Sequence, residues 1–148
     1  MEQTIRKLEQ LLEVGVDYIG RCSQSDLNDK PNPEKWSKKE IIGHLIDSGI
    51  NNLQRFTEIQ FECKPYRIRK YNQDELVIAN SYQKADIKEI VGAWVAVNNR
   101  IQALMKQQSE ETLGFEIVLG NGAVSDLKFL MEDYVEHLEH HLKQITKG

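Results

Sequence analysis

The sequence lacks the features that mark secreted, membrane-spanning and nucleotide-binding proteins. No stretch approaches the roughly 20 apolar residues that span a bilayer. Residues 1–7 contain neither a long apolar run nor a small-residue cleavage site. Glycine-rich phosphate-binding loops and the GxSxG motif of serine hydrolases are also missing. We therefore expect a cytoplasmic protein without membrane association, and any catalysis must depend on other residues.

Cysteine is scarce, and neither sign of charge is in large excess. The two cysteines, Cys22 and Cys63, show no CxxC or zinc-finger spacing. We expect them at opposite ends of a helical hairpin, too far apart for a disulfide bond. The net charge of -4 argues against nucleic acid as a partner. A chain of 148 residues, 40% of them hydrophobic, can form a single domain over residues 1–148 with a core that needs no disulfide.

Helical periodicity extends over most of the sequence. Four stretches repeat apolar residues every three or four positions: residues 2–21, residues 37 to about 65, residues 85–107 and residues 125 to about 146. Ser37 and Glu40 match a capping box, which marks the start of the second helix. Apolar residues on both sides of Asn121-Gly122 predict a short β-hairpin before the fourth helix. The sequence thus predicts an all-α four-helix bundle with one small hairpin.

A long connector joins the second and third predicted helices. It spans residues 62–84 and contains Pro65, several aromatic residues and the basic residues Arg67, Arg69 and Lys70. Connectors of this length are uncommon in compact domains and are usually functional. The basic residues of segment 67–70 could attract an anionic substrate, or they could belong to an ordinary solvated loop.

Histidine is rare but clustered. Three of the four histidines, His137, His140 and His141, lie within five residues of one another. A seam of the fourth helix has spacings of 3, 4, 3 and 4 and consists of Leu127, Leu130, Tyr134, His137 and His141. His137 and His141 should therefore point inward one turn apart, a geometry that can chelate one divalent cation. His140 should point about 100° away, at the surface or behind a ligand, although His137 with His140 is an alternative pair.

The fourth histidine, His44, lies in the first half of the second helix, about 10 Å from its start. The histidines of the fourth helix lie near the end of theirs. The two groups meet only if these helices are antiparallel, which requires an up-down-down-up order with a long crossover between helices two and three. The connector 62–84 is long enough to make that crossover, so its length and the histidine positions favour the same topology.

Two motifs carry a family resemblance. The first is Trp36-Ser37-x-x-Glu40-x-x-x-His44-Leu45-x-Asp47, and the second is His137-x-x-His140-His141-x-x-Gln144-Ile145. In this order they resemble the DinB/YfiT-like four-helix metalloproteins, and the resemblance covers nearly the whole chain. It implies His44, His137 and His141 as metal ligands, a zinc or nickel ion, and frequent homodimers. Known members include thiol-dependent transferases and isomerases that use low-molecular-weight thiols.

Residues around His44 suggest further roles. Asp47, one turn away, is the only candidate for a catalytic group: it could orient an imidazole or accept a substrate proton, or it could be a solvated helix residue. Trp36 should pack at the start of the second helix, bordering the metal end. Gly43 and Gly49 reduce bulk near His44 and would leave room for a pocket.

Two functions stay open at this point. The first is a small metalloenzyme, a transferase or hydrolase, in which three histidines hold a divalent metal that activates water or a low-molecular-weight thiol for attack on a small electrophilic substrate. The second is a non-catalytic module that binds a metal or small ligand and acts through helix-mediated partner or dimer contacts. A purely structural bundle with satisfied histidines is a third interpretation.

Overall fold

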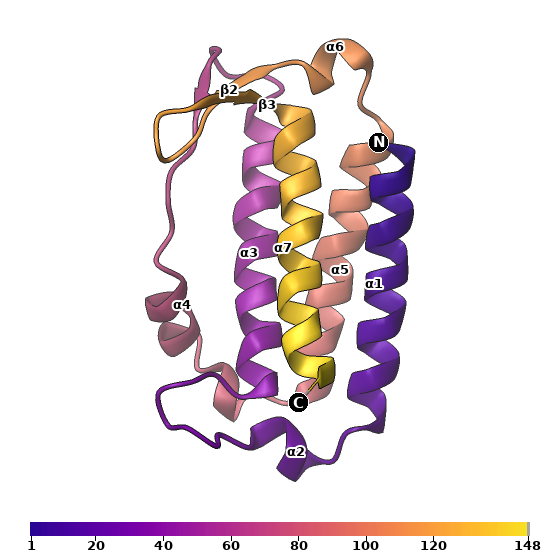
Figure 1. The fold of residues 1–148 in the computed structure, drawn as a ribbon, viewed down its shortest axis with the longest axis vertical. Helices are drawn as coiled ribbons and strands as arrows, with labels where there is room; N and C mark the ends of the chain where they lie inside the picture. Colours follow the sequence, from indigo (N-terminus) through magenta and orange to yellow (C-terminus); the bar gives the residue numbers. More distant parts are fainter. Residues whose placement is uncertain (148) are drawn as a thin grey trace.

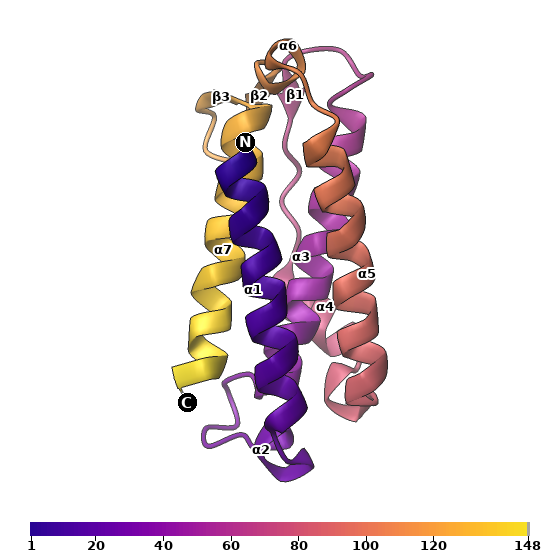
Figure 2. The ribbon, with the colours of Figure 1, turned by 90° about the vertical axis from the view of Figure 1, so that its right-hand side faces the viewer.

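The computed structural model describes residues 1–147 and contains four long helices packed side by side (Figure 1). They are α1 (Glu2–Arg21), α3 (Lys38–Glu58), α5 (Ile87–Lys106) and α7 (Leu127–Lys147). Helices α3 and α5 run parallel to each other and antiparallel to α1 and α7, as Figures 1 and 2 show. The up-down-down-up bundle is therefore confirmed. None of the helices in the described part of the chain is long and apolar enough to cross a membrane.

Helix α3 begins where the sequence predicts. The hydroxyl of Ser37 accepts a hydrogen bond from the backbone amide of Glu40 at 3.1 Å, and the Glu40 carboxylate accepts one from the amide of Ser37 at 3.1 Å. This reciprocal pair satisfies two amides that have no partner within the helix. The predicted end near Pro65 is wrong, because the helix stops at Glu58 and the chain then turns.

The crossover between α3 and α5 is an ordered segment. It contains strand β1 (Tyr66–Arg67), helix α4 (Gln73–Ala79) and a 3₁₀ helix (Tyr82–Lys84), and it runs along the outer side of α3 (Figure 1). The predicted hairpin is confirmed as β2 (Glu116–Val118) paired with β3 (Val124–Asp126). Strand β1 pairs in parallel with β2, so the hairpin becomes a three-stranded sheet that fixes one end of the crossover. Two further short helices, α2 (Gln24–Asn28) and α6 (Glu110–Leu113), lie in the connections at opposite ends of the bundle.

The core lies between the four long helices. Trp94, Phe56 and Leu8 are among its largest fully buried side chains, and the buried Asn98 amide oxygen accepts a hydrogen bond from the Tyr134 hydroxyl at 2.7 Å. The predicted inward seam of α7 is correct only as far as Tyr134.

Beyond that residue, the core positions of α7 belong to Leu138, Leu142 and Ile145. His137 and His141 are half-buried on the flank that faces α3. The physical reason is that a helix of 3.6 residues per turn departs from a strict 3.5-residue seam by about 20° per heptad. Leucines therefore pack the end of the bundle, and the two histidines are left for another role.

Candidate metal centre

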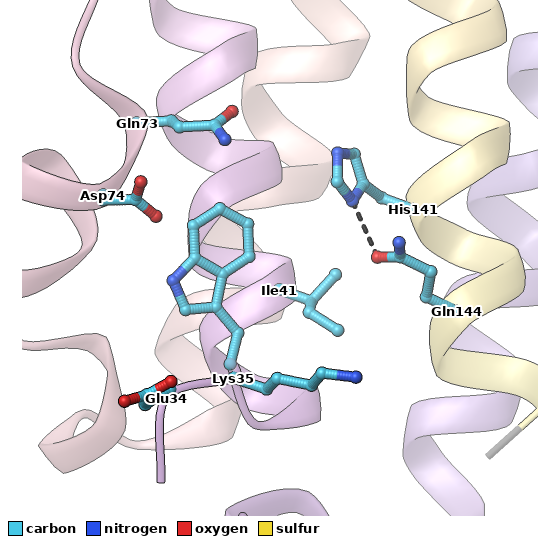
Figure 3. A pocket seen from close by; sticks show the side chains of 8 residues that line it. Glu34, Lys35, Ile41, Gln73, Asp74, His141 and Gln144 are labelled. Atoms are coloured by element: carbon cyan, nitrogen blue, oxygen red, sulfur yellow. Dashed lines mark hydrogen bonds between the residues drawn. The ribbon is translucent and has the colours of Figure 1, made fainter. Parts of the chain in front are cut away.

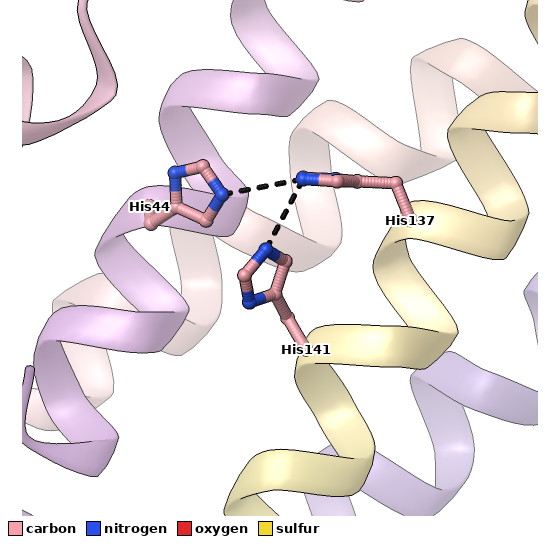
Figure 4. A group of neighbouring side chains, drawn as sticks. All are labelled: His44, His137 and His141. Atoms are coloured by element: carbon pink, nitrogen blue, oxygen red, sulfur yellow. Dashed lines mark hydrogen bonds between the residues drawn. The ribbon is translucent and has the colours of Figure 1, made fainter.

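Three histidine side chains converge between the first half of α3 and the end of α7 (Figure 4). His44 is fully buried, whereas His137 and His141 are half-buried. The Nε2 atom of His137 lies 3.4 Å from Nε2 of His44 and 3.1 Å from Nε2 of His141. One ring nitrogen from each residue fits within a group whose members all lie within 4.8 Å of one another. The antiparallel packing of α3 and α7 thus joins residues 93 positions apart in the sequence.

The spacing of these nitrogens suits a single metal ion. Zinc–nitrogen bonds of about 2.0–2.1 Å in a tetrahedron place two ligand nitrogens about 3.3 Å apart. The separations of 3.1 and 3.4 Å from Nε2 of His137 lie on either side of that value. Among residues 1–147, the cluster of possible metal ligands at this place consists of the three histidines alone. Three nitrogen ligands without a fourth protein ligand are typical of catalytic rather than structural zinc sites.

The surroundings of the three rings favour their neutral form. Burial, together with smaller effects from the neighbouring His141 and His137, lowers the pKa of His44 to about 3. Burial likewise lowers the pKa of His137 to about 4, with smaller effects from His141 and His140. Burial also lowers the pKa of His141. At neutral pH each ring therefore has an unprotonated nitrogen, the form that binds metals.

A neighbouring amide fixes the orientation of His141. Its Nδ1 atom lies 2.9 Å from the side-chain oxygen of Gln144, one turn further along α7. An amide oxygen only accepts hydrogen bonds, so Nδ1 carries the proton and the lone pair of Nε2 faces His137. His44 has no such support within the described residues, where its buried Nδ1 atom lacks a hydrogen-bond partner.

Trp36 covers the centre from the side of the chain that leads into α3. Its ring centroid lies 4.7 Å from that of His44 and 6.3 Å from that of His141. This agrees with the expectation that Trp36 borders the histidine end. Beside it opens a pocket of about 580 Å³, with Gln73 and Asp74 of the crossover on one side and His141 and Gln144 of α7 on the other (Figure 3). Glu34, Lys35, Trp36 and Ile41 complete its lining.

The structure gives Asp47 partners outside the histidine cluster. This buried carboxylate accepts hydrogen bonds from the Tyr82 hydroxyl at 2.6 Å and from the Asn80 side chain at 2.9 Å. Both partners belong to the crossover, so Asp47 ties that segment to α3. Burial raises the pKa of Asp47, although these two hydrogen bonds oppose the shift.

The expected pocket at the α3 glycines is absent from the described residues, because neighbouring side chains fill the space. A Cβ atom on Gly43 would lie 2.2 Å from two ring atoms of Tyr82, and one on Gly49 would lie 2.8 Å from Val97. The glycines therefore allow close approach of the crossover and of α5. His140 is exposed, and its Nε2 atom lies 3.4 Å from the side-chain nitrogen of Gln144.

The basic residues of segment 67–70 lie apart from the histidines, in a second pocket on the C-terminal half of α3. Sequence reasoning assigned no role to Gln144, Gln73 or Asp74. The spacing of three residues between His141 and Gln144 could have identified the first. Nothing local links Gln73 and Asp74 to the histidines, since the fold of the crossover brings them there.

Comparisons with known proteins agree with this architecture. A model of the DinB superfamily matches residues 2–145. YfiT of Bacillus subtilis is 26% identical in an alignment 162 positions long, which covers 99% of this chain and 79% of YfiT. The solved structure of YfiT, described as a probable metal-dependent hydrolase with an unusual four-helix bundle topology, matches with a TM-score of 0.88 at 20% identity, over 99% of this chain and 83% of that one.

A mycothiol-dependent maleylpyruvate isomerase also has this fold. It matches with a TM-score of 0.72 at 12% identity, over 95% of this chain and 58% of the isomerase chain. At such low identities the two solved structures establish a shared four-helix fold, and the family is established by the match over residues 2–145.

Proposed function

The chain belongs to the DinB superfamily, and from this membership we propose that it is a metal-dependent enzyme in which His44, His137 and His141 hold one divalent metal ion. The observation that carries the proposal is the convergence of three neutral imidazoles, with Nε2 separations of 3.1 and 3.4 Å around His137. The description of YfiT as a probable metal-dependent hydrolase supports the same class of chemistry.

Each residue of the centre has a distinct role in this proposal. When bound, a divalent metal supplies Lewis acidity that lowers the pKa of a water or thiol in its open position. His44 is held rigidly, because it is fully buried and Trp36 packs against its ring. Gln144 keeps His141 in the tautomer that presents Nε2. The pocket beside Trp36 and His141 then gives a substrate its way to the centre.

We place the reaction in the transfer of water or a low-molecular-weight thiol to a small electrophile. The pocket of about 580 Å³ lies within the range of small-molecule sites. Lys35 and the carboxylates Glu34 and Asp74 put charges of both signs on its wall, which suits a polar substrate. We assign Asp47 a positioning role, because one of its oxygens accepts hydrogen bonds from the Tyr82 hydroxyl and the Asn80 amide and so ties the crossover to α3.

Elemental analysis of the protein purified without chelators tests the metal site. We expect about one divalent ion per chain, zinc or nickel, and a large loss of metal in His44→Ala and His141→Ala. His140→Ala is the matched control, because His140 adjoins His141 but lies outside the cluster. Absence of metal after reconstitution, or equal metal content in His141→Ala and the wild type, would contradict the proposal.

Activity assays then separate an enzyme from a binding module. Metal-loaded protein should transfer a thiol to a chromogenic electrophile or hydrolyse an activated ester, and His141→Ala should lose that turnover while His140→Ala keeps it. Metal binding without turnover in either the thiol-transfer or the ester-hydrolysis assay would instead indicate a non-catalytic binding module. The homodimer implied by the family resemblance stays a prediction, which sedimentation of the purified protein tests.

A further inference from the structure

A second pocket, of about 550 Å³, lies between the C-terminal half of α3 and the first part of the crossover. Four cationic side chains line it: Arg55, Arg67, Arg69 and Lys70. Two carboxylates, Glu58 and Glu62, also contribute. Positive charge therefore accumulates in one hollow of a chain whose net charge is -4.

In the described part of the chain the cations of this pocket form no close ion pairs, although Arg69 is near enough to Glu58 to help lower the pKa of that carboxyl. Among residues 1–147, ion pairs involve Lys7, Lys30, Lys38 and other side chains elsewhere, but none of the four pocket cations. The Glu58 carboxylate accepts hydrogen bonds from neutral groups, the Tyr66 hydroxyl at 2.7 Å and the Gln54 side chain at 2.8 Å. With four cations and two carboxylates in its lining, the hollow keeps an excess of positive charge for a ligand.

Arg55 is the most constrained of the four. It is half-buried, and its guanidinium lies 5.3 Å from the centre of the Tyr71 ring. One terminal nitrogen donates to the side chain of Asn52 at 3.4 Å and the other to the backbone carbonyl of Arg69. A guanidinium has five N–H donors, so three have no acceptor among residues 1–147. Burial lowers the pKa of Arg55, and the neighbouring Tyr71 and Tyr66 offset this shift only in part.

The sheet fixes the rim of the pocket. Tyr66 and Arg67 pair with β2, and the amide of Ile68 donates to the carbonyl of Val118 at 2.9 Å. Alternate residues of an extended chain point to opposite sides, and Arg67 and Arg69 are both exposed while Tyr66 is buried.

The side chain of Lys70 packs against Gly120 of the hairpin, where a larger residue would clash with it. A Cβ atom on Gly120 would lie 2.5 Å from Cε of Lys70, so the aliphatic part of the lysine passes directly over this glycine. The residue is exposed, and it also contributes to the lining of the pocket.

We propose that this pocket is a binding site for a small oxyanion, a phosphate or carboxylate group, with Arg55 at its base and Arg67 and Arg69 at its rim. A guanidinium fork suits the two oxygens of such a group. Arg55 follows His44 by 11 residues on α3, a separation of roughly 16 Å along the helix. The site is therefore distinct from the histidine centre, and it stands whether or not that centre is catalytic.

Calorimetric titration of the full-length protein with inorganic phosphate, and separately with succinate, tests the proposal. We expect saturable binding of at least one of them, weaker at high salt because ionic attraction is screened. Loss of a hydrogen-bonded charge in Arg55→Gln should weaken binding about 10-fold to 100-fold. Arg100→Gln, which removes an exposed arginine of α5, should leave affinity within about 2-fold, as expected for a distant charge.

Two further variants control for misfolding and for anion binding at the metal site. Arg69→Gln leaves the backbone carbonyl that anchors Arg55 in place, so it should weaken anion binding even if Arg55→Gln fails to fold. His141→Ala should bind the anion normally, which separates this pocket from a metal that could itself bind phosphate. No saturable binding of either anion at millimolar concentration, or equal losses in Arg69→Gln and Arg100→Gln, would overturn the proposal.

Discussion

The contact between Gly43 and Tyr82 supports a sharp prediction about how the crossover is attached to the bundle. A Cβ atom on Gly43 would lie 2.2 Å from Cγ and Cδ2 of Tyr82 and 2.8 Å from its Cβ. These atoms form the root of the side chain, so a rotation of its far end cannot relieve the clash. The backbone around Ser81, which has a φ of 53°, would have to move.

Gly43→Ala should therefore destabilise the protein, although alanine is the better helix former. The substitution gains about 0.8–1.0 kcal/mol of helix propensity. Overpacking costs about 1–3 kcal/mol, and displacement of Tyr82 loses a hydrogen bond to the Asp47 carboxylate worth about 1.5–3 kcal/mol. The net expectation is a loss of about 1.5–5 kcal/mol in the free energy of unfolding.

Urea denaturation of the metal-free protein measures this loss, with Gly92→Ala as the matched control. Gly92 lies within α5, and a Cβ atom there would meet nothing within 4 Å. That variant should gain about 0.5–1 kcal/mol. Tyr82→Phe keeps the ring and should show the loss of the hydrogen bond alone. If Gly43→Ala were as stable as Gly92→Ala, the proposed attachment of the crossover through Tyr82 would be refuted.

Three further predictions concern the histidine centre. The free energy of unfolding of the metal-free protein should fall as the pH drops from about 6.5 to 5. In this range the histidines of the unfolded chain bind protons, whereas His44 and His137 of the folded protein, with pKa lowered to about 3 and about 4, do not. A free energy of unfolding that stays constant over this pH range in urea titrations would contradict the prediction. Gln144→Ala should weaken metal binding about 10-fold to 100-fold in competition with a chromophoric chelator, while Lys143→Ala should not. Metal at 100 times its dissociation constant should raise the free energy of unfolding by about 2.7 kcal/mol, an increase that thermal or urea denaturation should not find in His44→Ala.

The topology could be predicted from the sequence because two separate features favoured it. His44 and the histidines of α7 meet only in an antiparallel pair of helices, and the connector 62–84 is long enough for the crossover that such a pair needs. The capping box at Ser37 fixed the start of α3, and through it the height of His44 in the bundle. Local chemistry and chain length therefore favoured the fold, and the family resemblance implied that the three histidines converge.

The rest depended on contacts between segments that are distant in sequence. Strand β1 has only two residues, and no local pattern predicts its pairing with β2. Gly43 predicted a pocket beside His44, but the side chain of Tyr82 from the crossover fills the space next to this glycine. No local pattern on α3 distinguishes Arg55, because its place in a pocket depends on segment 67–70 folding back beside it.

The division of roles along α7 explains how one bundle combines stability with a polar centre. Leu138, Leu142 and Ile145 complete the core, so the helix packs without help from His137 and His141. On the facing helix, every residue from Ile41 to Gly49 is buried, because the crossover covers the side of α3 that a bundle helix usually leaves to solvent. His44 consequently has no direct contact with water, and a substrate must approach from the half-exposed histidines of α7. The crossover thus determines which side of the centre is open. Substitutions along it should change access of substrate to the centre more than they change the positions of the metal ligands.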